Sequence, residues 1–304
     1  MKPAVTIIMA TYNRAHFIKE TLRSIQNQTF GNWECLIIDD AGTDNTKEVI
    51  ADLLNNDGRF HYLKRPDNYK KGLPGCRNYG LDLAKGEYVV FFDDDDFVHP
   101  QNLEITLKFI KRLDVDFVHF RKKAYETSLP EIIDYSKDFN FLTNDVVLED
   151  HLTHRVGLAS CTILWNRDCF MDVRFNEYLM YAEEWECYTR ILLNNKLGKS
   201  INAVLYYNFK HSNSNTGEFY KANPIRVQSN VEAIKMVVIN LKKNGLLNLK
   251  LKKYFIRTSI SFKEYNLKDN LIVLYEDNTF NYNLYYFKIR IKSRLYKLKK
   301  RLLK

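Results

Sequence analysis

An apolar run that ends in four consecutive aspartates constrains the fold of this chain more than any other stretch. Residues 86–92 have the composition of a buried β-strand, and Asp93, Asp94, Asp95 and Asp96 follow at once. Carboxylates this close repel one another, so a buried cluster is costly unless a cation lies among them. Oxygen ligands of this kind favour Mg²⁺ or Mn²⁺. A solvated acidic turn is the alternative, but ligand sites in open α/β sheets lie at the carboxyl ends of strands.

The first 120 residues alternate between two periodicities. Short apolar runs predict strands at residues 4–10, 35–39, 60–64, 88–92 and 116–120. Between them, apolar residues recur with helical spacing, as in the triplets Ile18, Leu22, Ile25 and Leu103, Leu107, Ile110. This alternation predicts an α/β fold in which helices cover both faces of a mainly parallel sheet.

A change of pattern near residue 220 predicts a second region. Residues 227–241 and 249–262 have helical periodicity, and a polar segment at 212–217 precedes them. We therefore expect one domain over residues 1–215 and a C-terminal helical extension over residues 216–304.

Composition bounds the class of protein. With 304 residues, of which 45% are hydrophobic, the chain is long and apolar enough for a folded globular protein. Its five cysteines are odd in number and form no Cys-x-x-Cys pair, which predicts reduced thiols, mostly in the core, in a cytosolic setting. The first residues lead directly into a strand-like segment, so we expect neither a signal peptide nor a membrane-spanning helix.

Four further motifs accompany the acidic run. Residues 10–14 (Ala-Thr-Tyr-Asn-Arg) end the first predicted strand, and residues 39–44 (Asp-Asp-Ala-Gly-Thr-Asp) end the second, where a carboxylate can accept hydrogen bonds from a base or ribose. Residues 72–80 open a helix just before the acidic strand, and residues 182–186 (Ala-Glu-Glu-Trp-Glu) start another.

With these motifs in this order, the chain resembles the family-two glycosyltransferases of the GT-A fold over roughly residues 3–215. The resemblance implies a Rossmann-like GT-A catalytic domain at 1–215. It also implies a divalent cofactor, Mn²⁺ or Mg²⁺, and inverting transfer from a UDP-sugar without a covalent intermediate. The expected acceptor is a saccharide or polyprenyl-linked oligosaccharide used in surface-polysaccharide biosynthesis.

The resemblance also implies roles for individual residues. Thr11, Tyr12 and Arg14 would line the nucleotide pocket, and Asp40 would hydrogen-bond the uracil. Asp93 and Asp94 would lie near the ribose and the donor sugar, and Arg77 would contact the diphosphate. Asp95 would be the direct metal ligand. Taken alone, Tyr12 also fits a core aromatic, Asp40 a turn or helix N-cap, and Arg77 a surface ion pair.

Three further residues follow from the same resemblance. Relatives usually carry Glu-Asp and an aromatic residue where this chain has Glu183, Glu184 and Trp185. Glu184 is therefore the expected base that deprotonates the acceptor hydroxyl, and Glu183 is the alternative. The alternative is that Glu183 and Glu184 are solvated residues at the start of a helix, where the helix dipole favours acids. His211 falls where relatives place a His on the metal or diphosphate, although the Tyr-Arg that usually precedes it is absent.

The C-terminal segment has an unusual charge distribution. Nine Lys or Arg residues and no acid lie within residues 285–304, so the formal excess of +9 belongs to this tail. Its apolar positions fit one face of a helix: Phe287, Ile291, Leu295, Leu298 and Leu302. A basic amphipathic helix of this kind suits an anionic membrane surface, which predicts a cytoplasmic protein held on the inner face of the cell membrane. Packing on the body of the protein or binding to nucleic acid are alternatives, and nucleic acid is not expected.

Two other functions remain open from the sequence. A sugar nucleotidyltransferase uses a similar sheet and metal, but usually has a Gly-rich basic loop where residues 10–14 stand. A non-catalytic nucleotide-binding scaffold recruited to membranes has no need of Asp95 or Glu184.

Overall fold

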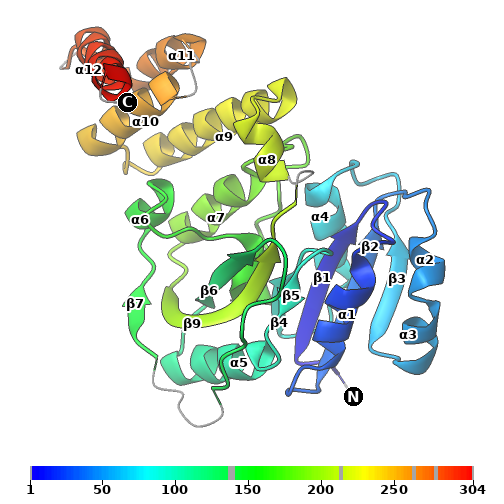
Figure 1. Cartoon of the computed structure of the whole chain (residues 1–304). Helices are drawn as coiled ribbons and strands as arrows, with labels where there is room; N and C mark the ends of the chain where they lie inside the picture. Colours follow the sequence, from blue (N-terminus) through cyan, green and yellow to red (C-terminus); the bar gives the residue numbers. More distant parts are fainter. Residues whose placement is uncertain (1, 136–140, 212–214, 262–264, 277–279, 303–304) are drawn as a thin grey trace. The chain divides into compact units, whose positions relative to one another are not determined.

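The computed structural model describes residues 2–135, 141–211, 215–261, 265–276 and 280–302 (Figure 1). The chain divides into two compact units, Met1–Asn223 and Pro224–Lys304. This division lies eight residues beyond the boundary expected after residue 215, because α8 (Asn215–Tyr220) belongs to the first unit.

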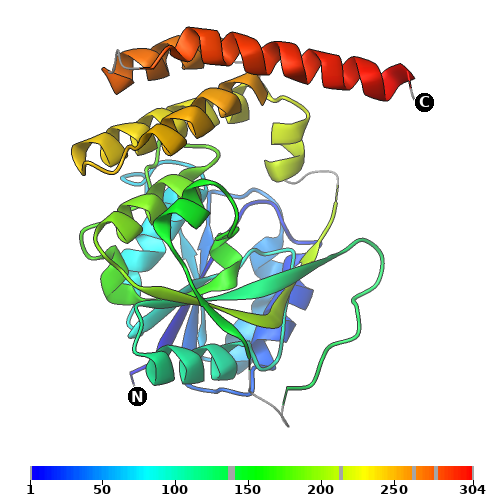
Figure 2. The same ribbon diagram turned by 90° about the vertical axis from the view of Figure 1, so that its left-hand side faces the viewer.

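The first unit is built on one sheet. Within the described residues its strands are β1 (Val5–Thr11), β2 (Trp33–Asp39), β3 (Phe60–Lys64), β4 (Tyr88–Phe91), β5 (Phe97–Val98), β6 (Phe117–Tyr125), β7 (Thr143–Asp145), β8 (Ile163–Asn166) and β9 (Gly198–Phe209). Their order is β3-β2-β1-β4-β8-β6-β9-β5, and β7 also pairs with β9. Figure 2 shows these strands fanning out with the twist usual in such sheets.

The sheet is mixed. Strands β3, β2, β1 and β4 are parallel, as the sequence predicts. Strand β8 runs antiparallel to both β4 and β6, and β9 is parallel to β6 but antiparallel to β5 and β7. The α/β fold with flanking helices is confirmed, while the parallel arrangement is confined to the N-terminal half and to the β6–β9 pair.

Helices cover this sheet. They are α1 (Ile18–Gln26), α2 (Thr46–Val49), α3 (Ala51–Asn56), α4 (Leu73–Leu83), α5 (Asn102–Leu113), α6 (Leu148–Leu152), α7 (Glu183–Leu193) and α8, with 3₁₀ turns η1 (Ser160–Thr162) and η2 (Arg167–Phe170). Strand β1 shows why both faces are covered: Val5, Ile7 and Met9 pack in one apolar cluster with α1 and α5, whereas Ile8 packs in another with α7. Each such side chain contributes about 1.5–3 kcal/mol when fully buried.

The five cysteines are buried and form no disulfide, in line with the sequence. Burial raises the pKa of the Cys161 thiol well above its usual value, so the thiol stays protonated at neutral pH. These residues act as small apolar core groups.

The second unit is helical. It contains α9 (Pro224–Lys243), α10 (Leu249–Ser261), α11 (Tyr265–Tyr275) and α12 (Tyr282–Leu302). In α12, Tyr282 and Tyr286 are buried, whereas Phe287, Ile291 and Leu295 are exposed. The other two positions of the predicted apolar stripe, Leu298 and Leu302, have side chains outside the described part. Among the helices that the structure describes, none combines the length and apolar character needed to cross a membrane.

Candidate active site

Strand register brings the sequence motifs to one edge of the sheet. Thr11 at the end of β1 pairs with Asp39 at the end of β2, and Ile8 pairs with Phe91 at the end of β4. The segments that carry Arg14, Asp40 and the four aspartates therefore leave the sheet side by side. Strand β9 ends at the same place because its Tyr207 pairs with Phe97, just after the acidic run.

The acidic run faces three basic groups, one of which, Arg77, has its Nη2 4.0 Å from Asp93 Oδ1. His211 Nε2 lies 2.9 Å from Asp95 Oδ2. Arg14 lies somewhat further away, with its Nε 3.7 Å from Asp94 Oδ1 and its Nη2 3.9 Å from Asp95 Oδ2. The structure thus brings together both residues expected to hold the metal, although 116 positions separate them in the chain.

Burial changes the acid strength of three of the aspartates. Desolvation, followed by the charge of Asp95, raises the pKa of Asp94 to about 7. Desolvation raises the pKa of Asp93 to about 6 even though Arg77 opposes it, and desolvation with the charge of Asp93 raises that of Asp96 to about 8. A nearby cation would favour the ionised forms of all three groups.

Two buried oxygen atoms at this edge are suited to binding a ligand. Among the described residues, neither Asp94 Oδ2 nor Thr11 Oγ1 forms a hydrogen bond of good geometry, although Thr11 lies close enough to Asp94 to oppose the rise in its pKa. Such orphaned atoms are rare in folded proteins and are usually satisfied by a ligand, an ion or water. Carboxylate oxygens suit Mn²⁺ or Mg²⁺, and an imidazole nitrogen favours the transition metal of the two, Mn²⁺. The Asp95–His211 pair, with Asp94 beside it, therefore fits the cation that the sequence predicts.

A second group of possible metal ligands lies within the same acidic run and the residues around it. Ligand atoms of Asp93, Asp96 and Cys161 lie within 4.8 Å of one another. Lys122 Nζ lies 3.8 Å from Cys161 Sγ, so an ammonium already occupies this neighbourhood. Because that thiol is also protonated at neutral pH, we favour the Asp95–His211 pair as the cation site.

Tyr12 and Asp40, which the resemblance assigns to the nucleotide, directly follow β1 and β2. The Tyr12 side chain is 44% exposed, so it is not a core aromatic, and Lys71 Nζ lies 4.2 Å from its ring centroid. Asp40 is buried, with Oδ1 2.5 Å from Arg65 Nε and Oδ2 accepting from the Gly72 amide at 2.9 Å. It is not the N-cap of α2, which is Asn45. Its role in binding uracil stays a prediction.

Arg77 differs most from its expected surroundings. Its side chain is buried, so the surface ion pair is wrong. Its Nη1 lies 2.9 Å from Glu183 Oε1, and its Nη2 lies 3.1 Å from Glu184 Oε1 and 2.9 Å from Ser160 Oγ. Burial opposes its charge, but Glu184 and Glu183 outweigh that effect and raise the pKa of Arg77. The guanidinium is thus engaged mainly by protein groups, and its contact with a diphosphate stays a prediction.

The two acids at the start of α7 have different environments. Glu183 has a side chain 9% exposed, and burial raises its pKa despite Arg77. Glu184 is 26% exposed, and its Oε2 accepts from the Ser160 amide at 3.1 Å. Glu184 is therefore the acid that a bound acceptor can reach more readily, while Glu183 is a buried partner of Arg77.

Sequence reasoning missed two residues that shape this edge. Asn13 has a φ of 53°, and its Oδ1 accepts from the amides of Thr43 and Asp44 at 2.7 and 3.2 Å. It thereby ties the segment after β1 to the segment after β2, and the tolerance of Asn for positive φ was a usable signal. Ser160 contacts both Arg77 and Glu184, and nothing in its local sequence indicated this.

Comparison with solved structures defines the class of protein. The chain is similar to *S. aureus* TarS 1-349 in complex with UDP-GlcNAc, with a TM-score of 0.60, 21% identity, and coverage of 89% of this chain and 83% of that one. It is also similar to the mannosyltransferase PcManGT from *Pyrobaculum calidifontis* in complex with GDP-Man and Mn²⁺, with a TM-score of 0.52, 16% identity, and coverage of 96% and 88%. The fold is that of GT-A glycosyltransferases.

The chain belongs to Glycosyl transferase family 2, whose match covers residues 6–162. One relative is the GalNAc(5)-diNAcBac-PP-undecaprenol beta-1,3-glucosyltransferase of *Campylobacter jejuni*, 43% identical over 31% of this chain and 30% of that protein. Another is the UDP-Glc:alpha-D-GlcNAc-diphosphoundecaprenol beta-1,3-glucosyltransferase WfgD of *Escherichia coli*, 28% identical over 64% and 71%. The match thus spans under a third of the first relative's length.

Proposed function

We propose that this chain transfers a sugar from a UDP-sugar to a saccharide carried on a polyprenyl diphosphate, during the assembly of a cell-surface polysaccharide. The observation that carries the proposal is the meeting of Glu184, the aspartate run and His211 at one edge of a GT-A sheet. The choice of UDP and of a polyprenyl-linked acceptor is supported by the two relatives, which are named for undecaprenyl-diphosphate acceptors, one of them with UDP-Glc as donor.

Donor binding is assigned to residues after β1, β2 and β4. Tyr12 offers an exposed aromatic ring to the base of the nucleotide. Asp40 follows the end of β2, which is paired with the end of β1 next to Tyr12. We assign Arg14 and Thr11 to the diphosphate and ribose of the donor. Asp93 and Asp94 are assigned to the same part of the donor site. Asp95 and His211 would hold Mn²⁺ or Mg²⁺, whose charge offsets the negative charge of the departing diphosphate.

Glu184 is assigned as the general base. The acceptor hydroxyl oxygen attacks the anomeric carbon, the bond from that carbon to the UDP oxygen breaks, and the hydroxyl proton passes to Glu184. A single displacement of this kind inverts the configuration and needs no sugar–enzyme bond. Arg77 and the Ser160 amide each fix one oxygen of Glu184, so the carboxylate is oriented before the acceptor arrives.

Glu184→Gln is the direct test. We expect transfer, measured as UDP release with acceptor present, to fall by about 10²-fold or more because the base is lost. Stabilisation of the protein by UDP-sugar with Mn²⁺ in a thermal-shift assay should persist, and its Mn²⁺-dependent part should disappear in Asp95→Ala. The matched control is Glu48→Gln, an exposed Glu on α2.

The outcomes separate the candidate functions. Near-normal transfer in Glu184→Gln contradicts the assignment of the base. Formation of a nucleotide-sugar from a sugar phosphate indicates a nucleotidyltransferase, and nucleotide binding without any turnover indicates a scaffold.

The exposed face of α12 supports a place at the membrane. Phe287, Ile291 and Leu295 form its apolar stripe, and Lys288 and Lys292 belong to the same turns. We assign this face to the anionic inner surface of the cell membrane, where a polyprenyl-linked acceptor would lie.

A further inference from the structure

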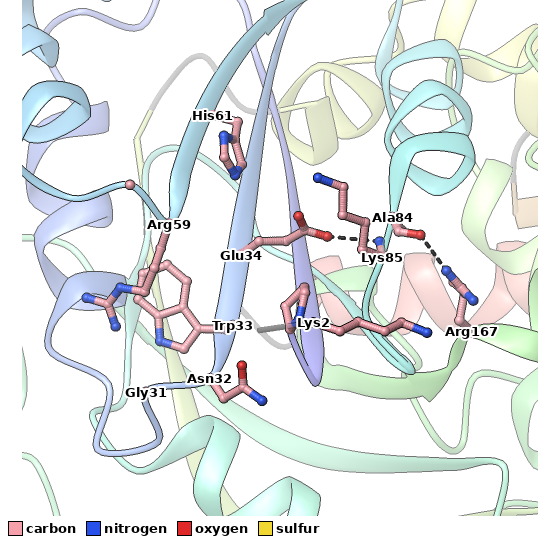
Figure 3. Close-up of a pocket in the computed structure, with 12 residues that line it drawn as sticks. Lys2, Gly31, Asn32, Trp33, Glu34, Arg59, His61, Ala84, Lys85 and Arg167 are labelled. Carbon is pink, nitrogen blue, oxygen red and sulfur yellow. Dashed lines mark hydrogen bonds between the residues drawn. The ribbon is translucent and has the colours of Figure 1, made fainter.

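A basic hollow lies at the opposite edge of the sheet from the acidic run (Figure 3). It has a volume of about 620 Å³, and the beginnings of β1, β2 and β4 surround it, since Val5 pairs with Trp33 on one side and Tyr88 on the other. The length of β1 separates the two edges by about 20 Å. The hollow is therefore distinct from the candidate active site.

Positive side chains outnumber negative ones around the basic hollow. Lys2, Arg59, Lys85 and Arg167 line it together with His61, and Glu34 is the acid among its lining residues. Glu34 is buried, and its Oε1 already accepts from Thr6 Oγ1 at 2.7 Å and from the Lys85 amide at 2.9 Å. Its carboxylate is therefore partly satisfied from within the protein.

The basic groups differ in how far their charge is balanced. Arg59 lies 3.9 Å over the Trp33 ring, and Asp57 accepts from it at 2.9 and 2.6 Å, so its charge is paired. Arg167 donates to the Ala84 carbonyl, and no carboxylate of the described residues forms an ion pair with it. Lys2 and Lys85 are exposed, and neither ammonium forms an ion pair with any residue in the described part of the chain.

We propose that the basic hollow binds the phosphate or diphosphate group of a small soluble molecule. Ammonium and guanidinium groups are strong donors to phosphate oxygens. In Figure 3, the Lys2 side chain extends toward Arg167, and Trp33 and Arg59 lie on the opposite side of the hollow. Trp33 is 2% exposed beneath Arg59, so it offers no platform on which the bases of a nucleic acid stack.

The test is isothermal titration of the full chain with inorganic pyrophosphate, with EDTA present to keep divalent cations from the acidic run. We expect one saturable site, and we expect Lys2→Ala/Lys85→Ala to weaken it by about tenfold or more through the loss of two charged donors. The matched control, Lys19→Ala/Lys243→Ala, removes two exposed lysines outside the hollow and should bind as the natural chain does.

A second variant blocks the hollow without changing its charge. A Cβ added to Gly58, one of its lining residues, meets no atom within 4 Å, so Gly58→Leu should fold normally and occupy the space. We expect it to lose pyrophosphate binding while its melting temperature is kept. The proposal is overturned if the natural chain shows no saturable binding, or if the control pair weakens binding as much as Lys2→Ala/Lys85→Ala. Binding that is unchanged in Gly58→Leu, or lost in Asp95→Ala, overturns it as well.

Discussion

At Asp94, burial and a neighbouring charge turn an ordinary carboxylic acid into a group that holds its proton near neutral pH. Its pKa of about 7 in the folded chain lies well above the ordinary value of 3.8 for an aspartate. Below pH 4 both folded and unfolded chains carry the proton, and the contribution to stability is fully present. Between pH 4 and pH 7 the unfolded chain releases the proton while the folded chain keeps it, so the contribution declines and is lost once pH has risen through 7.

This shift predicts a pH-dependent effect of Asp94→Asn. In EDTA, the difference in unfolding free energy between the variant and the natural chain should move in favour of the variant from pH 5 to pH 8, by up to a few kcal/mol. Urea unfolding at both pH values measures it, and Asp52→Asn, at an exposed position on α3, is the control. A pH-independent difference for Asp94→Asn contradicts the assigned environment.

Among the elements, α4, η1 and α7 are joined through one guanidinium. Arg77 on α4 reaches Ser160 of η1 and both Glu183 and Glu184 at the start of α7. The first turn of α7 carries three acids, which the helix dipole favours, but two of them also lie against a buried cation. The local conformation at the candidate base therefore depends on a residue of another helix.

Arg77→Gln should be severely destabilising. Removing the cation leaves two acids unpaired, which costs about 3–5 kcal/mol of unfolding free energy, measured by urea denaturation. The matched control is Arg174→Gln, which breaks an Arg174–Asp82 pair whose side chains are both 40% exposed and should cost about 1 kcal/mol or less. Equal losses in the two variants contradict the role given to Arg77.

For the whole molecule, the exposed apolar stripe of α12 predicts that the chain binds to membranes. Phe287→Ser/Ile291→Ser/Leu295→Ser removes the exposed apolar stripe but keeps every basic residue and the buried Tyr282 and Tyr286. We expect this variant to sediment poorly with anionic vesicles, because much of the apolar area that enters the interface is lost.

The controls for α12 use the same vesicle assay. Leu249→Ser on α10 removes an exposed Leu elsewhere in the second unit and should sediment as the natural chain does. Unchanged sedimentation of the triple variant contradicts membrane docking by this face.

Local periodicity predicted much of the fold and little of its second half. The strands expected at residues 35–39, 60–64 and 88–92 match β2, β3 and β4 to within two residues, because short apolar runs indicate buried parallel strands directly. Strands β5, β7, β8 and β9 were not foreseen. Strands β7 and β8 lie in a stretch of irregular sequence, and their antiparallel pairing depends on distant partners in β4, β6 and β9.

The sequence by itself determined the family motifs, the alternation of strands and helices, and the set of charged residues available to a site. Only the tertiary structure decided which of these residues meet. Asp95 and His211 lie 116 positions apart, and Arg77 and Glu183 lie 106 apart. Periodicity indicates which residues share a face of one helix or one strand. Pairs that are distant in the sequence form only once strand register and helix packing have brought their elements together.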